Sequence, residues 1–460
     1  MFMKKVMTLI IVLTVSSVFF VTDLNGKKGT GGEFIREPIF NSKIYFFESG
    51  KGHAKSVVLI HGIGDEGAEI WKNLIPELEN KYHVVALDLP GFARSSKEND
   101  LYSPQNYAAF INWIVKKYTK GPLYIIGHSL GGAIALYYAG TYPENLERII
   151  IVDSAGILNR SAFIKNFINI EPNKFLDIMN IPVSAVQNLI IANLESMDKG
   201  FKEEPGGSSL SSELLKKKLY SGDPAKTAGM VLLNTDFSKI VDKIEVPTLI
   251  IWGENDHVSP LRTGRLLGWM LPESDLRIMP GLGHCPMIDQ PDDFNKIIID
   301  WLSVPVKKKE IKTPSFTSNK VFICEGKDCV ISNGDYDRIE VKNSNDARIV
   351  NVSAKFIYIE RSIASIESSY IKSRDIGVKA IDSVVNLSGC SIDSDVAVLT
   401  SNSSVDLAGV KLTGKSAAIK EAALKSGDMS TIIFSVSKIK SPFNDGYKHE
   451  IKLVTERNPY

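Results

Sequence analysis

The chain has 460 residues, more than a single hydrophobic core usually serves, so we expect two or three domains. Its hydrophobic fraction of 44% and charged fraction of 23% are typical of a globular protein. The formal net charge of +1 gives no electrostatic reason for a polyanionic partner, and no nucleic-acid partner is predicted.

Residues 1–30 have the pattern of an export segment. Lys4 and Lys5 precede an apolar run, Val6 to Val21, and this order is typical of a secretory signal. The run lies at the short end of the roughly 17–25 residues that a membrane span needs. No A-x-A cleavage site follows it, so a cleaved signal and a retained membrane anchor both stay open. We therefore expect an exported or membrane-anchored protein of the cell envelope, periplasm or exterior.

Residues 31–302 are predicted to form an α/β domain. Short runs rich in Ile and Val are typical of buried parallel strands, and they read SVVLIHG, HVVALDLPG, PLYIIGHS, RIIIVDSAG and PTLIIWGE. The amphipathic segments IWKNLIPELENKY and NYAAFINWIVKKY, which lie between these runs, predict helices. Strands that alternate with helices favour an open, mostly parallel sheet with helices on both faces.

Residues 157–239 interrupt this alternation with helix-like segments and no strands between them. The segments are SAFIKNFINI, VSAVQNLIIANLESM and SSELLKKKLY, and the turn EEPGGSS separates the last two. We interpret the region as a helical insertion between two strands.

The remainder of the chain changes character. Residues 303–319 contain Lys and Pro without an apolar period and are predicted to be a linker. Residues 320–460 carry short β-like runs separated by Ser, Asn, Asp and Gly. Three segments, which begin at Ser362, Ser383 and Ser403, can be stacked with steps of 21 and 20 residues. The stack aligns apolar residues at two positions, with Ile366, Leu387 and Leu407 at the first and Ile371, Ile392 and Leu412 at the second.

A repeat of about 20 residues with strand composition predicts a solenoid. This repeat resembles a right-handed parallel β-helix, in which each coil takes about that many residues. The alternative is an antiparallel sandwich, because hairpins whose strands are about 10 residues apart would also repeat about every 20 residues.

The four cysteines give little redox information. Cys324 and Cys329 lie close together between two strand-like runs, where they are either a disulfide, which export permits, or two reduced thiols. Their spacing, with no second pair, is not that of a zinc site. Cys285 and Cys390 are predicted to be single structural thiols.

The stretch GHSLG, residues 127–131, has the pattern G-x-S-x-G, which places a nucleophilic serine on a sharp strand-to-helix turn. The strand-like PLYIIG precedes it and the helix-like LGGAIALYYAGTYP follows it, as such a turn requires. Gly127, Gly131 and Gly132 leave room for the strained backbone. Ser129 is therefore the predicted nucleophile.

A serine nucleophile needs a base, and the base needs an acid that orients it. His284 lies in a Gly-flanked loop after a strand-like segment, and Asp256 follows the end of another strand-like run. The chain order Ser129, Asp256, His284 is the order that this architecture requires. The alternative acids are Asp153, at the end of the strand after the nucleophile's helix, and Glu254.

The oxyanion of an acyl-transfer intermediate needs two backbone N–H donors. Leu130, directly after the nucleophile, offers one, and Ile63, in the loop after an early strand, offers the other. His61 and His128 each lie inside a turn motif, so we predict that they position the site rather than act as its base. No metal-binding pair of histidines is present in the sequence, and no metal or other cofactor is expected.

Five motifs in this order, HGIG, DLPGFARSS, GHSLGG, WGENDHVSP and GLGHCP, resemble the α/β-hydrolase fold superfamily, in its branch of lipases, esterases and C–C bond hydrolases. The resemblance covers about residues 43–304 and leaves the tail unassigned. It implies that the insertion, residues 157–239, is a helical lid over the site. Asp88 and Arg94, in the second motif, are expected to hold their own loop.

The predicted function is a serine hydrolase, a carboxylesterase or lipase-like enzyme that acts on a small-molecule or lipid ester. A nucleophilic Ser instead of Asp disfavours a dehalogenase or epoxide hydrolase. The alternative enzyme is a C–C bond hydrolase, for which Arg160 is the nearby candidate to bind a substrate carboxylate. A hypothesis of another class gives the main role to the C-terminal domain, as an envelope- or glycan-binding module. The repeats of this domain have little aromatic content, with Tyr358 and Tyr370 as the main exceptions, which favours a positioning or stabilising role instead.

Overall fold

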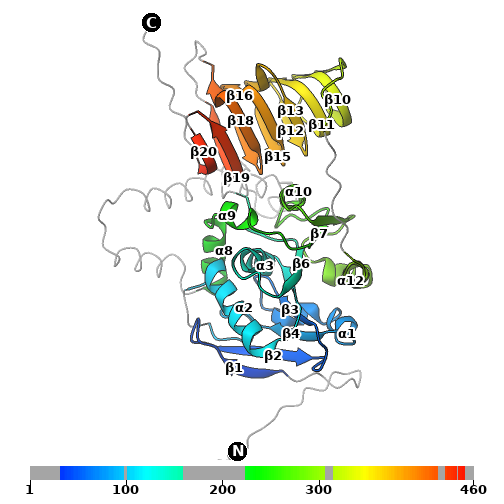
Figure 1. Cartoon of the computed structure of the whole chain (residues 1–460), viewed down its shortest axis with the longest axis vertical. Helices are drawn as coiled ribbons and strands as arrows, with labels where there is room; N and C mark the ends of the chain where they lie inside the picture. The colour runs from blue at the N-terminus through cyan, green and yellow to red at the C-terminus, as the bar shows by residue number, and fades with distance from the viewer. Residues whose placement is uncertain are drawn as a thin grey trace, which may run out of the picture.

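The computed structural model describes residues 32–97, 101–158, 223–305, 314–422, 430–442 and 444–450. These residues form an α/β unit and a β unit that lies against one end of it (Figure 1). The predicted export segment, residues 1–30, lies outside the described residues. No helix in the described parts of the chain is long and apolar enough to cross a membrane.

The α/β unit is built on an eight-stranded sheet with the order β1-β2-β4-β3-β5-β6-β7-β8. Its strands are β1 (Glu33–Arg36), β2 (Lys43–Ser49), β3 (Ser56–Ile60), β4 (His83–Leu87), β5 (Leu123–His128), β6 (Leu146–Val152), β7 (Thr248–Gly253) and β8 (Ser274–Met279). β2 is antiparallel to β1 and β4, and the strands from β4 to β8 pair in parallel. The five apolar runs form β3 to β7, so the predicted open, mostly parallel sheet is confirmed.

Helices cover both faces of this sheet. They are the 3-10 helix η1 (Gly67–Trp71), α1 (Ile75–Leu78), α2 (Pro104–Tyr118), α3 (Leu130–Thr141), α8 (Pro224–Leu233), α9 (Ser238–Val241), α10 (Leu261–Met270), α11 (Pro286–Asp289) and α12 (Pro291–Ser303). Successive residues of β3 alternate between two cores, with Val58 and Ile60 against α2 and α3, and Val57 and Leu59 on the side of η1, α1 and α12. Every residue of β3 is therefore buried, which explains its continuous apolar sequence.

One helix prediction is wrong. The segment IWKNLIPELENKY does not form a single helix, because only η1 and the four-residue α1 are helical there. Pro76 lies in the first turn of α1, and a proline there cannot continue a helix from the preceding turn, since it lacks the N–H and its ring would clash. The segment NYAAFINWIVKKY does form a helix, α2, which Ser103 caps by accepting a hydrogen bond from the Asn106 N–H.

The predicted insertion lies between β6 and β7. Of residues 157–239, the structure describes the two ends, and the second end contains α8 and the start of α9. The three helix-like segments named above, the Gly-rich turn and Arg160 lie outside the described residues.

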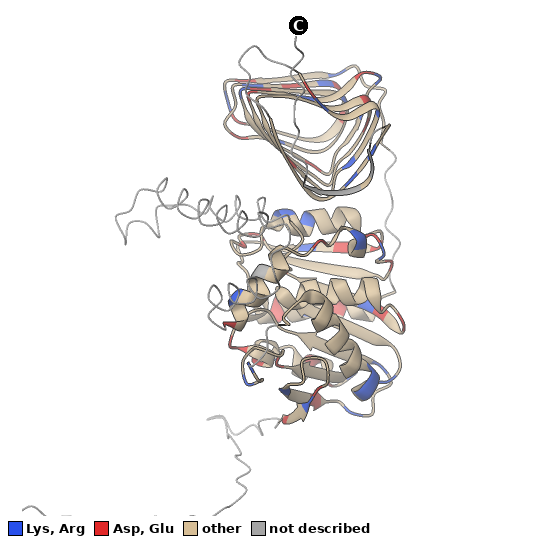
Figure 2. Cartoon of the chain, turned by 90° about the vertical axis from the view of Figure 1, so that its left-hand side faces the viewer, with Lys and Arg blue, Asp and Glu red and all other residues tan. Residues whose placement is uncertain are grey.

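The second unit is a parallel β-helix. Its strands are β9 (Val321–Glu325), β10 (Cys329–Lys342), β11 (Ala347–Glu360), β12 (Ile363–Glu367), β13 (Tyr370–Lys372), β14 (Ile376–Ile381), β15 (Val384–Ser388), β16 (Ser391–Ser401), β17 (Ser404–Ala408), β18 (Lys411–Glu421), β19 (Thr431–Ser441) and β20 (Asn444–Glu450). The pairings from β9 to β19 are parallel, and β20 is antiparallel to β19. Figure 2 shows the coils stacked around a common axis.

The register of the coils confirms the predicted repeat. Both predicted sets of aligned apolar residues are register partners in successive coils: Ile366, Leu387 and Leu407 in one column, and Ile371, Ile392 and Leu412 in the other. All of these residues are buried in one core inside the coil. The antiparallel sandwich is therefore excluded, because its paired strands would run in opposite directions.

The turns between strands are built from stacked polar residues. At one corner, each backbone N–H donates to the serine hydroxyl of the next coil at 3.0–3.1 Å, and the column is Ser344, Ser362, Ser383, Ser403 and Ser430. The residue before each of the first four of these serines has a positive φ, and Asn343 and Asn402 are types that tolerate this conformation. Serines of the Ser-, Asn- and Asp-rich separators thus provide hydrogen-bond acceptors for the buried backbone N–H groups at this corner of the coil.

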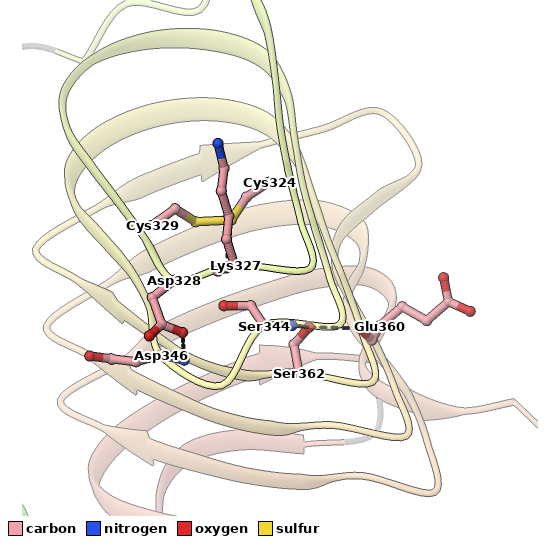
Figure 3. The surroundings of a disulfide bond; sticks show 8 residues. All are labelled: Cys324, Lys327, Asp328, Cys329, Ser344, Asp346, Glu360 and Ser362. Atoms are coloured by element: carbon pink, nitrogen blue, oxygen red, sulfur yellow. Dashed lines mark hydrogen bonds between the residues drawn. A yellow bond between two sulfur atoms is a disulfide. The ribbon is translucent and has the colours of Figure 1, made fainter.

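Cys324 and Cys329 form a disulfide in the first coil, so the oxidised alternative is the one that the structure contains (Figure 3). The bond closes the turn between β9 and β10, and the Asp328 carboxylate in this turn accepts the Asp346 N–H of the next coil at 2.9 Å. Cys285 and Cys390 are free thiols.

Candidate active site

Ser129 lies alone between the end of β5 and the start of α3. Its backbone has φ 52° and ψ −115°, a conformation that L-residues rarely adopt. A Cβ at Gly127 would lie 2.1 Å from the Gly131 carbonyl oxygen, and a Cβ at Gly131 would lie 2.2 Å from that of Ile60. Both glycines are therefore required, and the strained turn holds Ser129 at the carboxyl edge of the sheet, where open α/β sheets bind ligands.

Asp256 and His284 meet at the same edge, on the loops after β7 and β8. The Asp256 Oδ2 lies 2.8 Å from the His284 Nδ1. The other oxygen, Oδ1, accepts the N–H groups of Val258 and Ser259 at 2.8 and 2.9 Å. The side chain of Asp256 is fully buried, whereas that of His284 is 18% exposed. The acid is thus fixed by its own loop and the imidazole keeps an open edge.

His128, the last residue of β5, links the serine turn to the His284 loop. Its Nε2 lies 2.8 Å from the His284 carbonyl oxygen, and the centroids of the two rings are 4.8 Å apart. Burial, and then the neighbouring His284, lower the pKa of His128 to about 3. His128 is therefore neutral at physiological pH, and its N–H donates to the carbonyl.

His61 is also held by backbone groups. Its Nε2 accepts the Leu89 N–H at 2.8 Å, and its Nδ1 donates to the Gly62 carbonyl at 2.6 Å. Burial lowers the pKa of His61, so this ring too stays neutral. Both imidazoles are thus hydrogen-bonded to backbone groups of the loops around the site.

The two predicted oxyanion donors lie on segments that border Ser129. Leu130 opens α3, where unpaired N–H groups and the helix dipole favour negative charge. A Cβ at Gly62 would lie 2.8 Å from the Ser129 Cβ, so the loop that carries Ile63 passes directly against the serine. The Ile63 side chain is 40% exposed, and a Cβ at Gly229 of α8 would lie 3.8 Å from it. The described end of the insertion therefore lies over this loop.

The two alternative acids have other partners. The Asp153 Oδ1 accepts the Gly253 N–H at 2.9 Å, and its second oxygen is buried. Burial, and then Asp256, raise the pKa of Asp153 well above its usual range. The Glu254 carboxylate accepts the Gly281 N–H at 3.0 Å. Asp256 is the carboxylate that the structure brings to His284.

Two hydrogen bonds of Ser259 support the site and were not predicted from the sequence. Ser259 donates its hydroxyl to the Ser154 carbonyl at 2.5 Å, and its own carbonyl accepts the Trp252 Nε1–H at 2.9 Å. The signal was present, since an Asp followed three residues later by Ser, in NDHVS, is typical of a turn closed by the aspartate side chain. Asp88 and Arg94 hold their loop as expected, with the Arg94 Nε donating to Asp88 at 2.7 Å.

Metal chemistry has no candidate centre in the parts of the chain that the structure describes. Within these ranges, no three His, Cys, Asp or Glu side chains are grouped so that they could hold a metal ion.

Comparison with known proteins identifies relatives of the α/β unit. The family model of the alpha/beta hydrolase fold matches residues 55–291, just over half of the chain. A 2-hydroxy-6-oxononadienedioate/2-hydroxy-6-oxononatrienedioate hydrolase of Pseudomonas putida is 26% identical over 281 residues, which cover 58% of this chain and 95% of that protein. Lipase 1 of Psychrobacter immobilis is 26% identical over 258 residues, 55% of this chain and 78% of the lipase.

Solved structures also match the α/β unit. An esterase from Exiguobacterium antarcticum aligns with a TM-score of 0.43 and 21% identity, and the alignment covers 60% of this chain and all of the esterase.

Proposed function

Because this chain belongs to the alpha/beta hydrolase fold family, we propose that it is a serine hydrolase that cleaves a carboxylic ester through an acyl-enzyme on Ser129. The observation that carries this proposal is the hydrogen bond between Asp256 and His284, on loops that His128 ties to the strained Ser129 turn. The relatives include an enzyme named as a lipase, which supports an ester substrate.

The proposed reaction begins when His284 removes the proton from the Ser129 hydroxyl and the oxygen attacks the ester carbonyl. Asp256 holds the imidazole in the tautomer with the proton on Nδ1 and stabilises the imidazolium. The backbone N–H groups of Leu130 and Ile63 donate hydrogen bonds to the carbonyl oxygen and stabilise its negative charge. His284 then protonates the departing alcohol, and a water activated by His284 releases the acid from Ser129.

The direct test is hydrolysis of p-nitrophenyl esters of increasing acyl length by the full chain and by Ser129→Ala. We expect kcat to fall by about 10⁴-fold or more in the variant, as when a nucleophile is removed from comparable enzymes. Ser303→Ala, an exposed serine on α12, serves as the matched control. Preference for short chains would indicate an esterase, and preference for long chains a lipase. Equal rates for the wild type and Ser129→Ala on every ester would contradict the proposal.

A C–C bond hydrolase is the second candidate, and the similarity to the Pseudomonas putida enzyme favours it. Its substrate would be a 2-hydroxy-6-oxo dienoic acid, which needs a basic side chain for the carboxylate. Arg160 is the residue that the sequence suggests for this contact. The test follows turnover of such a substrate by the loss of its dienol absorbance. Turnover faster than that of the esters, and no turnover in Arg160→Met, would favour this activity.

We also propose that the protein is exported or anchored at the cell envelope. The Cys324–Cys329 disulfide supports this proposal, because such bonds persist in oxidising compartments and are rare in the cytosol. Fractionation of cells, with detection of the chain in the envelope, periplasm or medium, tests it. Recovery of the chain from the cytosol with both thiols reduced would contradict it.

A further inference from the structure

Helix α10 lies between the two units and is packed on two sides (Figures 1 and 2). On the side of the α/β sheet, a Cβ at Gly264 would lie 2.6 Å from the Trp252 ring of β7. On the opposite side, five residues spaced as i, i+3, i+4, i+7 and i+8 form one stripe, and they are Arg262, Arg265, Leu266, Trp269 and Met270. This docking stripe faces the β-helix.

The polar part of the docking stripe is a buried ion pair. Arg262, whose side chain is 13% exposed, donates to the Asp406 carboxylate at 2.9 Å, and the side chain of Asp406 is 3% exposed. The same guanidinium donates to the Ser388 hydroxyl and to the Leu387 carbonyl. These groups belong to two successive coils of the β-helix. Three donors of one rigid guanidinium thus fix α10 against both coils.

The apolar part of the stripe meets the corners of the coils. Ser368, Gly389 and Gly409 occupy the same corner in three successive coils, all with positive φ. A Cβ at Gly409 would lie 1.8 Å from Leu266, and one at Gly389 would lie 2.9 Å from Trp269. Glycine is therefore needed here for close approach as well as for backbone conformation.

The buried cores of the two units join at this contact. Ala408, Ile433 and Val436 of the β-helix belong to the same apolar cluster as α2, α3 and α10 of the hydrolase unit. Tyr370, one of the two aromatic residues considered for glycan binding, packs its ring on Trp269 with the centroids 4.9 Å apart. It is therefore part of the internal contact.

The docking stripe is close in sequence to the predicted catalytic acid. α10 begins directly after Pro260, which ends the loop whose N–H groups hold Asp256. A displacement of the first turn of α10 would pull on Ser259, which donates to the Asp256 carboxylate and is bonded to Trp252. Arg262 lies in that first turn.

We propose that the β-helix positions the catalytic acid of the hydrolase by fixing α10, and that Arg262 is the positioning residue that couples the two units. The proposal rests on the proposed function for its effect on turnover. It assigns the C-terminal unit an internal structural role in catalysis, carried by the ion pair of Arg262 with Asp406 and by the glycine corners.

The first test measures kcat and KM of the full chain for an activated ester. Arg262→Met, which keeps an unbranched apolar stem but is shorter and removes the donors, is expected to lower kcat at least tenfold and to change KM less than twofold. Asp406→Asn, in the other unit, should lower kcat in the same direction. The double variant should be no slower than Arg262→Met, because coupled residues are not additive. Arg277→Met, whose side chain is 57% exposed on β8, is the control.

The second test is independent of activity. Hydrogen exchange of the backbone is expected to speed up at least tenfold in residues 256–267 of Arg262→Met and to stay unchanged in Arg277→Met. Unchanged exchange in folded Arg262→Met and Asp406→Asn, or wild-type kcat in both, would overturn the proposal. If the wild type hydrolyses no ester, the proposed function fails, and the exchange measurement still tests whether the β-helix holds the acid loop.

Discussion

At the scale of single residues, buried ionisable groups next to the histidine–acid pair have pKa values shifted toward their neutral forms. His128 donates from a neutral ring, and burial, followed by Asp256, raises the pKa of Asp153 well above its usual range. A buried group with one backbone partner positions its neighbours without adding a competing charge. This leaves Ser129, His284 and Asp256 as the residues to which we assign the proposed catalytic roles.

Asp153 gives a stability prediction. Its folded-state pKa is raised, so its contribution is present below the unfolded pKa near 3.8 and is lost as pH rises toward the folded pKa. Asp153→Asn needs no proton, so its stability relative to wild type should grow with pH, by about 1.4 kcal/mol per pH unit within that window. Urea unfolding from pH 4 to 8 measures this, with Asp275→Asn, at a partly exposed position, as control. Parallel curves for wild type and Asp153→Asn would contradict the assignment.

His128 gives a kinetic prediction. His128→Phe removes the hydrogen bond to the His284 carbonyl, and a net loss of about 0.5–1.5 kcal/mol corresponds to a fall in kcat of about 2- to 13-fold. The pH profile of kcat should keep its shape, because the wild-type ring is already neutral above about pH 3. A loss of several thousandfold would instead identify His128 as a base.

At the scale of elements, the sequence predicts what depends on local pattern. The five apolar runs form strands, and the 20- and 21-residue steps give the coil register, because apolar periodicity reports burial directly. The prediction of one helix across Pro76 is wrong because the amphipathic spacing of a segment does not show that its proline lacks an N–H. The antiparallel strand β1 was not predicted, since EFIR is short and largely exposed. The candidate triad was predicted because motif order fixes which loops meet at one sheet edge.

The serine column of the β-helix gives a prediction for this element. The Ser383 hydroxyl accepts the buried Ser362 N–H at 3.1 Å and donates to the Ile381 carbonyl at 2.6 Å. Ser383→Ala should lower the free energy of unfolding by about 1–3 kcal/mol, because it leaves that N–H without a partner. Ser416→Ala, at an exposed position of β18, should cost far less. Equal denaturation midpoints for the two variants would exclude a role for the column.

At the scale of the whole molecule, the contact between the units could not be predicted from the sequence. Arg262, Arg265 and Trp269 lie on a helix face that would be solvent-exposed in an isolated hydrolase, and their partners follow about 100 residues or more later in the chain. Nothing in the local pattern separates such a face from a surface. Its partner is defined only once the coils are stacked and Gly389 and Gly409 lie side by side.

The disulfide gives a prediction at this scale. It closes a short turn in the first coil, away from α10, so the Cys324→Ala/Cys329→Ala double variant should lose about 2 kcal/mol of stability and keep its kcat. Thermal unfolding and the ester assay, each with and without a reductant for the wild type, measure the two effects. A parallel loss of activity would show that the first coil also supports the site.

The central claim is that Ser129 is an activated nucleophile, and covalent labelling tests it most directly for both the ester and the C–C reading. The full chain is incubated with a fluorophosphonate and the modified peptide is located by mass spectrometry. We predict one adduct on Ser129, labelling that slows at least a hundredfold in His284→Ala, and none on Ser129→Ala. No adduct on the folded wild type, or equal labelling of Ser129→Ala, would contradict the account.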